Sequence, residues 1–194
     1  MIDTAAELLQ TYAGLDPHDE HGSDTPQRFL AMLDELTRCK STGNHEENRK
    51  HIQNCIKWKL FPTNKDDMIV VQNIPFVSLC NHHLVPFIGA AHVGYVPNKK
   101  IAGLSKFARV VTHFARRLQV QENLTNDIAD FLEKHLEKPK GVAVLLQAEH
   151  LCMTIRGVQS PGTKTTTSSM RGVFGLHDRT AKAEFMQIIG GQLK

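Results

Sequence analysis

Long apolar runs are missing from this sequence. The longest runs, such as VAVLL at 142–146, have the length of a buried strand, whereas a membrane-spanning helix needs about 20 apolar residues. No N-terminal stretch has the pattern of a signal peptide. We therefore expect a cytoplasmic protein that makes no contact with a membrane.

Cysteines are few and far apart. The four stand at positions 39, 55, 80 and 152, and this spacing does not resemble the framework of a small disulfide-rich domain. Metal binding or burial is the expected use. Cys39 and Cys55 lie beside a polar stretch, and we expect them to be structural bystanders.

A strong excess of one charge is also missing. The chain has 23 basic and 20 acidic residues, a net charge of +3, and only 6% of its residues are aromatic. A nucleic-acid-binding module would need a basic patch interleaved with aromatic side chains. We therefore expect no nucleic-acid partner. The 41% of hydrophobic and 22% of charged residues are typical of a globular domain.

The pattern of apolar residues predicts an α+β protein with antiparallel strands and helices on one face. A polar stretch at 40–50 separates an N-terminal helical segment with its linker, residues 1–60, from a main domain of residues 61–194. Pro75 predicts an irregularity or an edge in its strand. We expect helices at 2–15, 23–39, 103–119, 121–139 and 179–191, and strands at 66–80, 90–100, 141–158 and 163–174.

The end of the strand expected at 141–158 has an unusual alternation. In AEHLCMTIRGV, residues 148–158, alternate positions hold His150, Cys152, Thr154 and Arg156. Since successive side chains of a strand point to opposite faces, we expect these four on one face and Leu151, Met153 and Ile155 in the core.

A metal site is predicted from SLCNHHLVPF, residues 78–87. Cys80 and His83 have the C-x-x-H spacing with which one turn offers two ligands, and Cys152 could supply a third. Two thiolates and one imidazole suit Zn²⁺, and three protein ligands leave a catalytic position open. His82 and His150 could carry protons beside it. A closed structural site that uses His82 or His150 as a fourth ligand remains the alternative.

A cationic group accompanies this site. Lys106 and Arg109 share one face near the start of a helix, and Arg156 stands on the strand of His150. Three converging cations would suit a polyphosphate. The alternative is that Lys106 and Arg109 only line the solvated side of an amphipathic helix.

Several separate blocks of this sequence resemble the signature blocks of the GTP cyclohydrolase I family, in order and at the expected separations. They cover roughly residues 20–190 and are DTPQRF, SLCNHHLVPFIGAAHVGYVPNKKIAGLSKFARVV, RRLQVQENLT, HLCMTIRGVQ and TKTTTSSMRGVF. The resemblance implies the tunnelling fold, with antiparallel sheet and paired helices on one face, in a toroidal homo-oligomer that we expect to be a decamer with active sites between subunits.

The resemblance also implies a reaction and a role for each matching residue. The family opens the imidazole ring of GTP at C8, releases formate and forms 7,8-dihydroneopterin triphosphate. Cys80, His83 and Cys152 match the zinc ligands, and His82 and His150 match the acid–base histidines. Two further groups match substrate contacts: Gln121 and Glu122 for guanine, and Arg28, Ser105, Lys106, Arg109 and Arg156 for the triphosphate.

Two positions depart from the family pattern. Asn81 stands where the family usually has glutamate, which removes a negative charge beside the metal, and Ala31 stands where a lysine is frequent. The alternatives to a GTP cyclohydrolase are therefore a non-catalytic nucleotide-binding relative, an enzyme for another purine nucleotide, and one that only opens the ring.

Overall fold

The computed structural model describes residues 1–16, 18–39, 52, 54–175 and 179–190. The chain forms two compact units, Met1–Arg38 and Cys39–Lys194. The polar stretch expected at 40–50 lies outside the described residues. Among the residues that are described, no helix is both long and apolar enough to span a bilayer.

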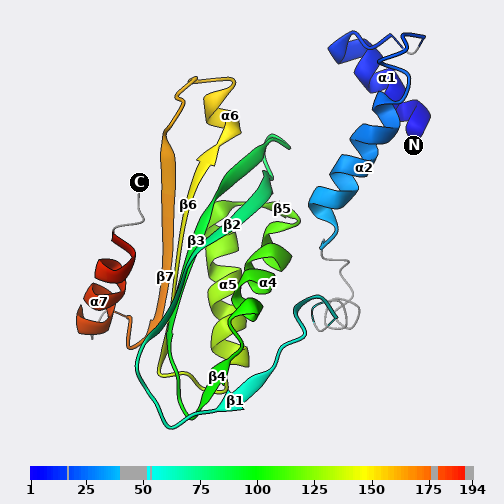
Figure 1. Cartoon of the computed structure of the whole chain (residues 1–194). Coiled ribbons are helices and arrows are strands. Elements are labelled where there is room, and N and C mark those ends of the chain that lie inside the picture. The colour runs from blue at the N-terminus through cyan, green and yellow to red at the C-terminus, as the bar shows by residue number, and fades with distance from the viewer. Residues whose placement is uncertain (17, 40–51, 53, 176–178, 191–194) are drawn as a thin grey trace. The chain divides into compact units, whose positions relative to one another are not determined.

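The first unit is a pair of helices, α1 (Ile2–Ala13) and α2 (Thr25–Thr37) (Figure 1). Helix α1 ends at Gly14, whose φ of 67° is the left-handed conformation that glycine adopts without steric cost. Helix α2 has Pro26 in its first turn, where the missing N–H costs no hydrogen bond. Both predicted N-terminal helices are confirmed.

The second unit is built on a five-stranded sheet with the order β5-β2-β3-β6-β7. All neighbours in it are antiparallel except β5, which runs parallel to the end of β2. The strands are β2 (Ile69–Cys80), β3 (Pro86–Val96), β5 (Leu118–Gln119), β6 (Gly141–His150) and β7 (Lys164–Gly172). A separate two-stranded sheet pairs β1 (Leu60–Pro62) with β4 (Lys100–Ala102).

The predicted irregularity at Pro75 is confirmed. The register between β2 and β3 shifts between Val71 and Ile74, and Asn73 there has a φ of 54°. Such a bulge takes up one extra residue and bends the strand, so β2 remains paired with β3 up to Leu79, beside Cys80.

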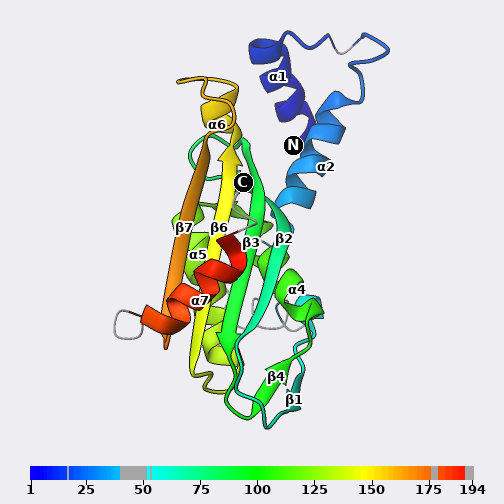
Figure 2. The same ribbon diagram turned by 60° about the vertical axis from the view of Figure 1, so that its left-hand side comes forward.

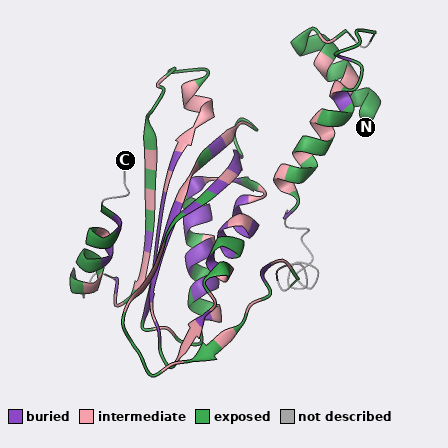
Figure 3. Cartoon of the chain, viewed as in Figure 1, coloured by how far each residue is buried: buried purple, intermediate pink, exposed green. Residues whose placement is uncertain are grey.

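Helices α4 (Ser105–Ala115) and α5 (Gln121–His135) cover one face of the sheet (Figure 1). The short strand β5 joins them. Figure 3 shows that the buried residues of both helices face the strands. Their apolar stripes, which include Phe107, Val111 and Leu132, pack on alternate residues of β6, such as Val144. Each such side chain contributes about 1.5–3 kcal/mol by leaving water.

The opposite face is covered by α7 (Arg179–Gly190), so the expectation of helices on one face holds for the pair α4 and α5 but not for this closing helix (Figure 2). Phe185 of α7 packs in a second core with Ala143 and Leu145, which alternate with the residues that face α5. A side chain at Gly94 would come within 2.7 Å of Phe185, so this contact requires glycine in β3.

The strand predicted at 141–158 ends at His150, and the chain then forms a short helix, α6 (Leu151–Thr154). The last pair between β6 and β3 joins His150 to Phe87, and the next residue of β3 is Pro86, which has no N–H to offer. The prediction that His150, Cys152, Thr154 and Arg156 share one face of a strand is therefore wrong. The molecule is an α+β protein. Strands β2 and β6 finish at the same end of the sheet, and α5 begins there (Figure 1).

Candidate active site

A tight turn follows β2 and carries the first two predicted ligands. Its backbone is closed by hydrogen bonds from Cys80 N to Val85 O, 3.0 Å, and from Leu84 N to Cys80 O, 2.9 Å. The turn brings the Nδ1 atoms of His83 and His82 to 3.7 and 3.9 Å from Cys80 Sγ. Cys80 is buried, whereas both histidines are exposed, so the turn offers its imidazoles toward solvent.

The third predicted ligand reaches the same point from α6. The ligand atoms of Cys80, His83 and Cys152 all lie within 4.8 Å of one another, and this group does not include His82 or His150. Zinc bond lengths of about 2.3 Å to sulfur and 2.0–2.1 Å to nitrogen place tetrahedral S and N ligands about 3.6 Å apart. The 3.7 Å between Cys80 Sγ and His83 Nδ1 fits this geometry. The residues therefore fit a zinc ion with three protein ligands.

The ionisation of the Cys152 thiol is affected by its neighbours. Burial raises the pKa of the Cys152 thiol, the nearby Cys80 raises it further, and the positive charge of Arg156 opposes the shift. A divalent cation among these sulfurs would relieve the repulsion between two thiolates, since coordinating thiols bind as thiolates.

His150 lies beside the cluster in a rigid environment. Its ring stacks on Phe87 with centroids 4.6 Å apart, and Nε2 lies 2.7 Å from Gln121 Oε1. Because the amide oxygen can only accept, Nε2 carries the proton in this contact. Burial lowers the pKa of His150, and the charge of Glu122 opposes this shift. His150 is therefore oriented and biased toward its neutral form.

Gln121 is buried at the start of α5, and its side chain is engaged at both ends. Its Nε2 donates to Thr165 O at 3.0 Å and to Thr167 Oγ1 at 3.1 Å, while Oε1 accepts from His150. Thr125 Oγ1 lies 2.6 Å from the same threonine hydroxyl. This network ties α5 to β7 and fixes the histidine. Glu122, the next residue, is exposed.

The predicted phosphate ligands of α4 lie away from the end of the sheet that carries the metal-ligand group. Ser105 is the first residue of α4 and lies about 15 Å along the helix axis from its last residue, Ala115. The chain returns to Cys80 only through β5, which follows that residue. Lys106 and Arg109 stand in the same first turns, whereas exposed Arg156 follows α6. Within one chain, Lys106, Arg109 and Arg156 therefore do not converge as expected.

Three other predicted or discussed positions are exposed. Arg28 belongs to the first unit, where it pairs with Asp24 at 3.2 Å, and Ala31 is in the same helix. Asn81 is exposed in the turn after β2, and its N–H donates to Gln119 O at 2.9 Å. The backbone of position 81 therefore holds β5 against the turn, whatever side chain it carries.

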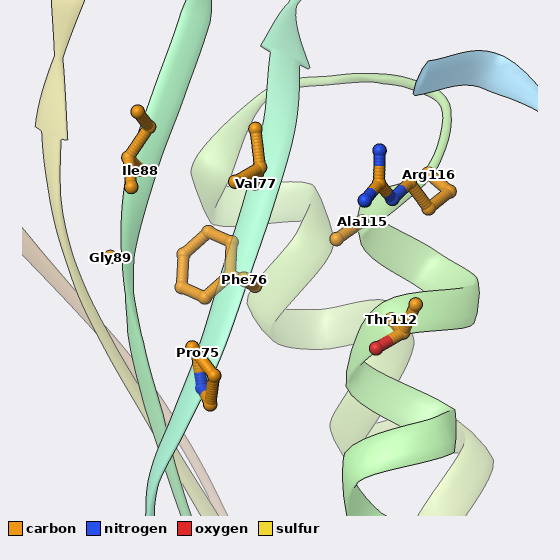
Figure 4. A pocket seen from close by; sticks show the side chains of 8 residues that line it. All are labelled: Pro75, Phe76, Val77, Ile88, Gly89, Thr112, Ala115 and Arg116. Atoms are coloured by element: carbon orange, nitrogen blue, oxygen red, sulfur yellow. The ribbon is translucent and has the colours of Figure 1, made fainter. Parts of the chain in front are cut away.

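A pocket of about 180 Å³ lies elsewhere, between β2, β3 and the end of α4. Figure 4 shows its lining, which includes Phe76, Ile88 and Thr112. None of the predicted site residues lines it. This pocket is therefore separate from the predicted site.

Comparison with known proteins decides the family. A sequence model described as GTP cyclohydrolase I matches residues 2–190. The chain belongs to the GTP cyclohydrolase I family. It is 46% identical to the GTP cyclohydrolase 1 of Aquifex aeolicus over 98% of this chain and 96% of that protein. It is 43% identical to the protein of that name from Carboxydothermus hydrogenoformans over 98% of this chain and 94% of that protein.

Sequence reasoning missed the surroundings of His150 in this family member. Phe87 stacks on it because the two residues are paired across β3 and β6, and Thr167 reaches Gln121 from β7. The strand register decides both contacts, and no local sequence pattern reveals that register.

Proposed function

We propose that this chain is a zinc-dependent GTP cyclohydrolase I, which hydrolyses GTP at C8 and yields formate and 7,8-dihydroneopterin triphosphate. Family membership over nearly the whole chain supports the activity. The observation that carries the site assignment is the mutual approach of Cys80, His83 and Cys152 within 4.8 Å, beside a histidine that a buried glutamine orients.

Cys80, His83 and Cys152 would hold the zinc ion. When bound, zinc supplies a Lewis acid that lowers the pKa of water to about 7 and so provides a nucleophile for C8 at neutral pH. The exposure of His83 and the partial exposure of Cys152 leave room for substrate at the open side.

His150 is the proton carrier for which the structure offers most support. Its Nε2 is committed to Gln121, so Nδ1 is the atom that remains for exchange with substrate. Burial favours the neutral ring, which can accept a proton at neutral pH. His82, on the turn of the metal ligands, is the second proton carrier in this proposal.

The guanine is proposed to bind at the start of α5. Glu122 is exposed there and close enough to affect the pKa of His150, and its carboxylate can accept from two N–H groups of guanine. Gln121 has its side-chain amide occupied by β7 and by His150. We therefore propose that the Gln121 side chain positions His150 and that the backbone of Gln121 contacts the guanine.

The triphosphate is proposed to bind between subunits. Arg156 stands near the metal ligands, whereas Ser105, Lys106 and Arg109 lie at the other end of α4. A toroidal oligomer, which we propose to be a decamer of tunnelling-fold subunits, would bring these residues and Arg28 to the site of a neighbouring subunit. The separation of the two groups within one chain supports such a shared site.

The test is to incubate the purified zinc-loaded protein with GTP and to follow formate release together with pterin absorbance. Equal amounts of both would support the proposal. Formate without pterin would overturn the complete reaction in favour of ring opening alone. Neither signal, despite bound zinc and nucleotide, would overturn it in favour of a binding relative or another purine substrate.

A further inference from the structure

A second group of metal-ligand side chains lies outside the candidate active site. The ligand atoms of Cys39, Cys55 and His113 all lie within 4.8 Å of one another. The donors are again two thiols and one imidazole, which suit zinc. From their position beside the polar stretch, both cysteines were expected to be structural bystanders.

Hydrogen bonds to the backbone groups of both cysteines, one from the main chain and one from a side chain, tie them to α4 and its C-cap residue on the two sides of His113. The N–H of Cys39 donates to Arg116 O at 3.0 Å, and Nη1 of Arg109 donates to Cys55 O at 3.3 Å. Residues 109, 113 and 116 follow the i, i+4, i+7 spacing of one helix face. The three donors are therefore brought together by contacts that do not involve their ligand atoms.

The group is more enclosed than the candidate active site. Cys39 and His113 are 5% and 3% exposed, and only Cys55 is partly accessible. His113 packs edge-on against Phe114 with ring centroids 5.2 Å apart. Structural zinc sites usually have four protein ligands, and metal binding there contributes to folding. This group has three, so its enclosure and not its ligand number is what fits a structural role.

A half-buried cation adjoins the group. Arg117 donates from Nη2 to His113 O at 3.5 Å, and its Nε has no hydrogen-bond partner among the described residues. The positive charge of Arg117 lies close enough to interact with Asp127 and Cys39. A neighbouring cation favours the thiolate form of cysteine, which is the form that binds metal.

We propose that Cys39, Cys55 and His113 bind a second zinc ion, separate from the catalytic one, whose role is structural. Water completes its coordination on the side of Cys55. The ion fixes the beginning of the second unit and the segment at Cys55 to the last turns of α4. That helix leads into β5, which pairs with Leu79 and Cys80, so the second site supports the base of the candidate active site.

The test uses the full chain with Cys80→Ser and Cys152→Ser, which removes the candidate catalytic site. The reduced, metal-free protein is titrated with Co²⁺, and the thiolate-to-cobalt charge-transfer absorption is recorded. We expect one tightly bound cobalt ion per chain with this absorption, and its replacement by zinc. A folded protein without the absorption would overturn the proposal.

Matched variants in the same background identify the ligands. Cys39→Ser and His113→Asn should each weaken cobalt binding at least about 10-fold, because each removes one of three ligands. His92→Asn changes another buried histidine, on β3, and should leave binding unchanged. Circular dichroism shows whether each variant folds. Equal binding by folded His113→Asn and His92→Asn chains would overturn the ligand assignment.

A disulfide between Cys39 and Cys55 would compete with metal. The intact mass of the protein purified with metal distinguishes the two, since a disulfide removes two hydrogens. We expect the reduced mass and two zinc ions per wild-type chain. A disulfide that re-forms in the presence of excess zinc would contradict the proposal.

Discussion

The two cysteine–histidine groups of this chain have the same donors but different surroundings. Cys80, His83 and Cys152 meet at one end of the sheet, where strands β2 and β6 finish, and the imidazole among these ligands is exposed. Cys39, Cys55 and His113 meet against α4, with the imidazole buried. Donor type alone would assign both groups the same role.

The neighbours distinguish them. Beside the first group stand His150, oriented by Gln121, and the exposed carboxylate of Glu122, which are groups that can move protons and bind a base. Beside the second group stands half-buried Arg117, whose positive charge interacts with Cys39. The donor set thus indicates which metal fits, and the surrounding groups indicate whether the metal can do chemistry.

Loss of a ligand should separate the two groups most strongly. Cys152→Ala should lower kcat/KM for GTP by more than about 100-fold, since even changes to partners of metal ligands cost about 10- to 100-fold. Cys39→Ala should lower the thermal midpoint of unfolding and leave the turnover of folded protein within about 3-fold, because a structural metal acts through stability. Formate release and calorimetry measure both effects. Similar losses of turnover in the two variants would refute the division of roles.

Removal of His150, the proposed proton carrier, should have the next largest effect. His150→Ala should keep zinc and lower kcat by about 10²–10⁴-fold, the usual contribution of general acid–base catalysis. His135→Ala is the control, because it removes a histidine that stacks on Phe131 of α5. Zinc content and single-turnover rates are measured together. Unchanged turnover of the His150 variant would remove this residue from the mechanism.

The glutamine that orients His150 should have an intermediate effect. Gln121→Leu removes the acceptor of His150 Nε2 and the donor to Thr165 O, and it should cost about 1–3 kcal/mol of unfolding free energy. If Gln121 positions the histidine, kcat should fall more than KM for GTP rises. Steady-state kinetics and urea unfolding separate the two terms. A rise in KM with unchanged kcat would instead show that the side chain binds guanine.

The smallest expected effect concerns the anchoring of α6. Glu149 accepts hydrogen bonds from Gly162 N and Thr154 Oγ1, both at 3.0 Å, and these bonds lower the pKa of its carboxyl group. A lowered folded pKa gives stability that is present at neutral pH and is lost as pH falls through that value. The difference in thermal midpoint between wild type and Glu149→Gln should therefore shrink from about pH 7 to about pH 3. A difference in thermal midpoint that stays constant with pH would show that the Glu149 carboxylate does not act as an anion in holding Thr154 of α6 and Gly162.

Much of the fold could be predicted from sequence because its elements carry strong local patterns. The helices at α4 and α5 follow from apolar stripes that include Phe107 and Leu132. The face that α7 covers could not be predicted, since amphipathicity shows that a helix buries one side but not on which side of the sheet. The end of β6 was missed because it depends on the position of Pro86 in the neighbouring strand.

The residues of the two metal-ligand groups were likewise predictable only in part. Cys80 and His83 could be paired from their spacing, since one turn brings them together. Cys152 does lie close to Cys80 and His83, but the argument that placed it there was wrong, because a helix and not a strand carries it. Cys39, Cys55 and His113 share no local pattern, and only the packing against α4 brings them together.

The most direct test of the account returns zinc to a chain that keeps only the first group. In metal-free Cys39→Ser/Cys55→Ser protein, formate release from GTP should rise in proportion to added zinc and level off at one zinc per chain. Further substitution of Cys152 should abolish that rise. Full turnover without zinc, or turnover that persists after Cys152 is replaced, would contradict the assignment of Cys80, His83 and Cys152 as the catalytic metal centre.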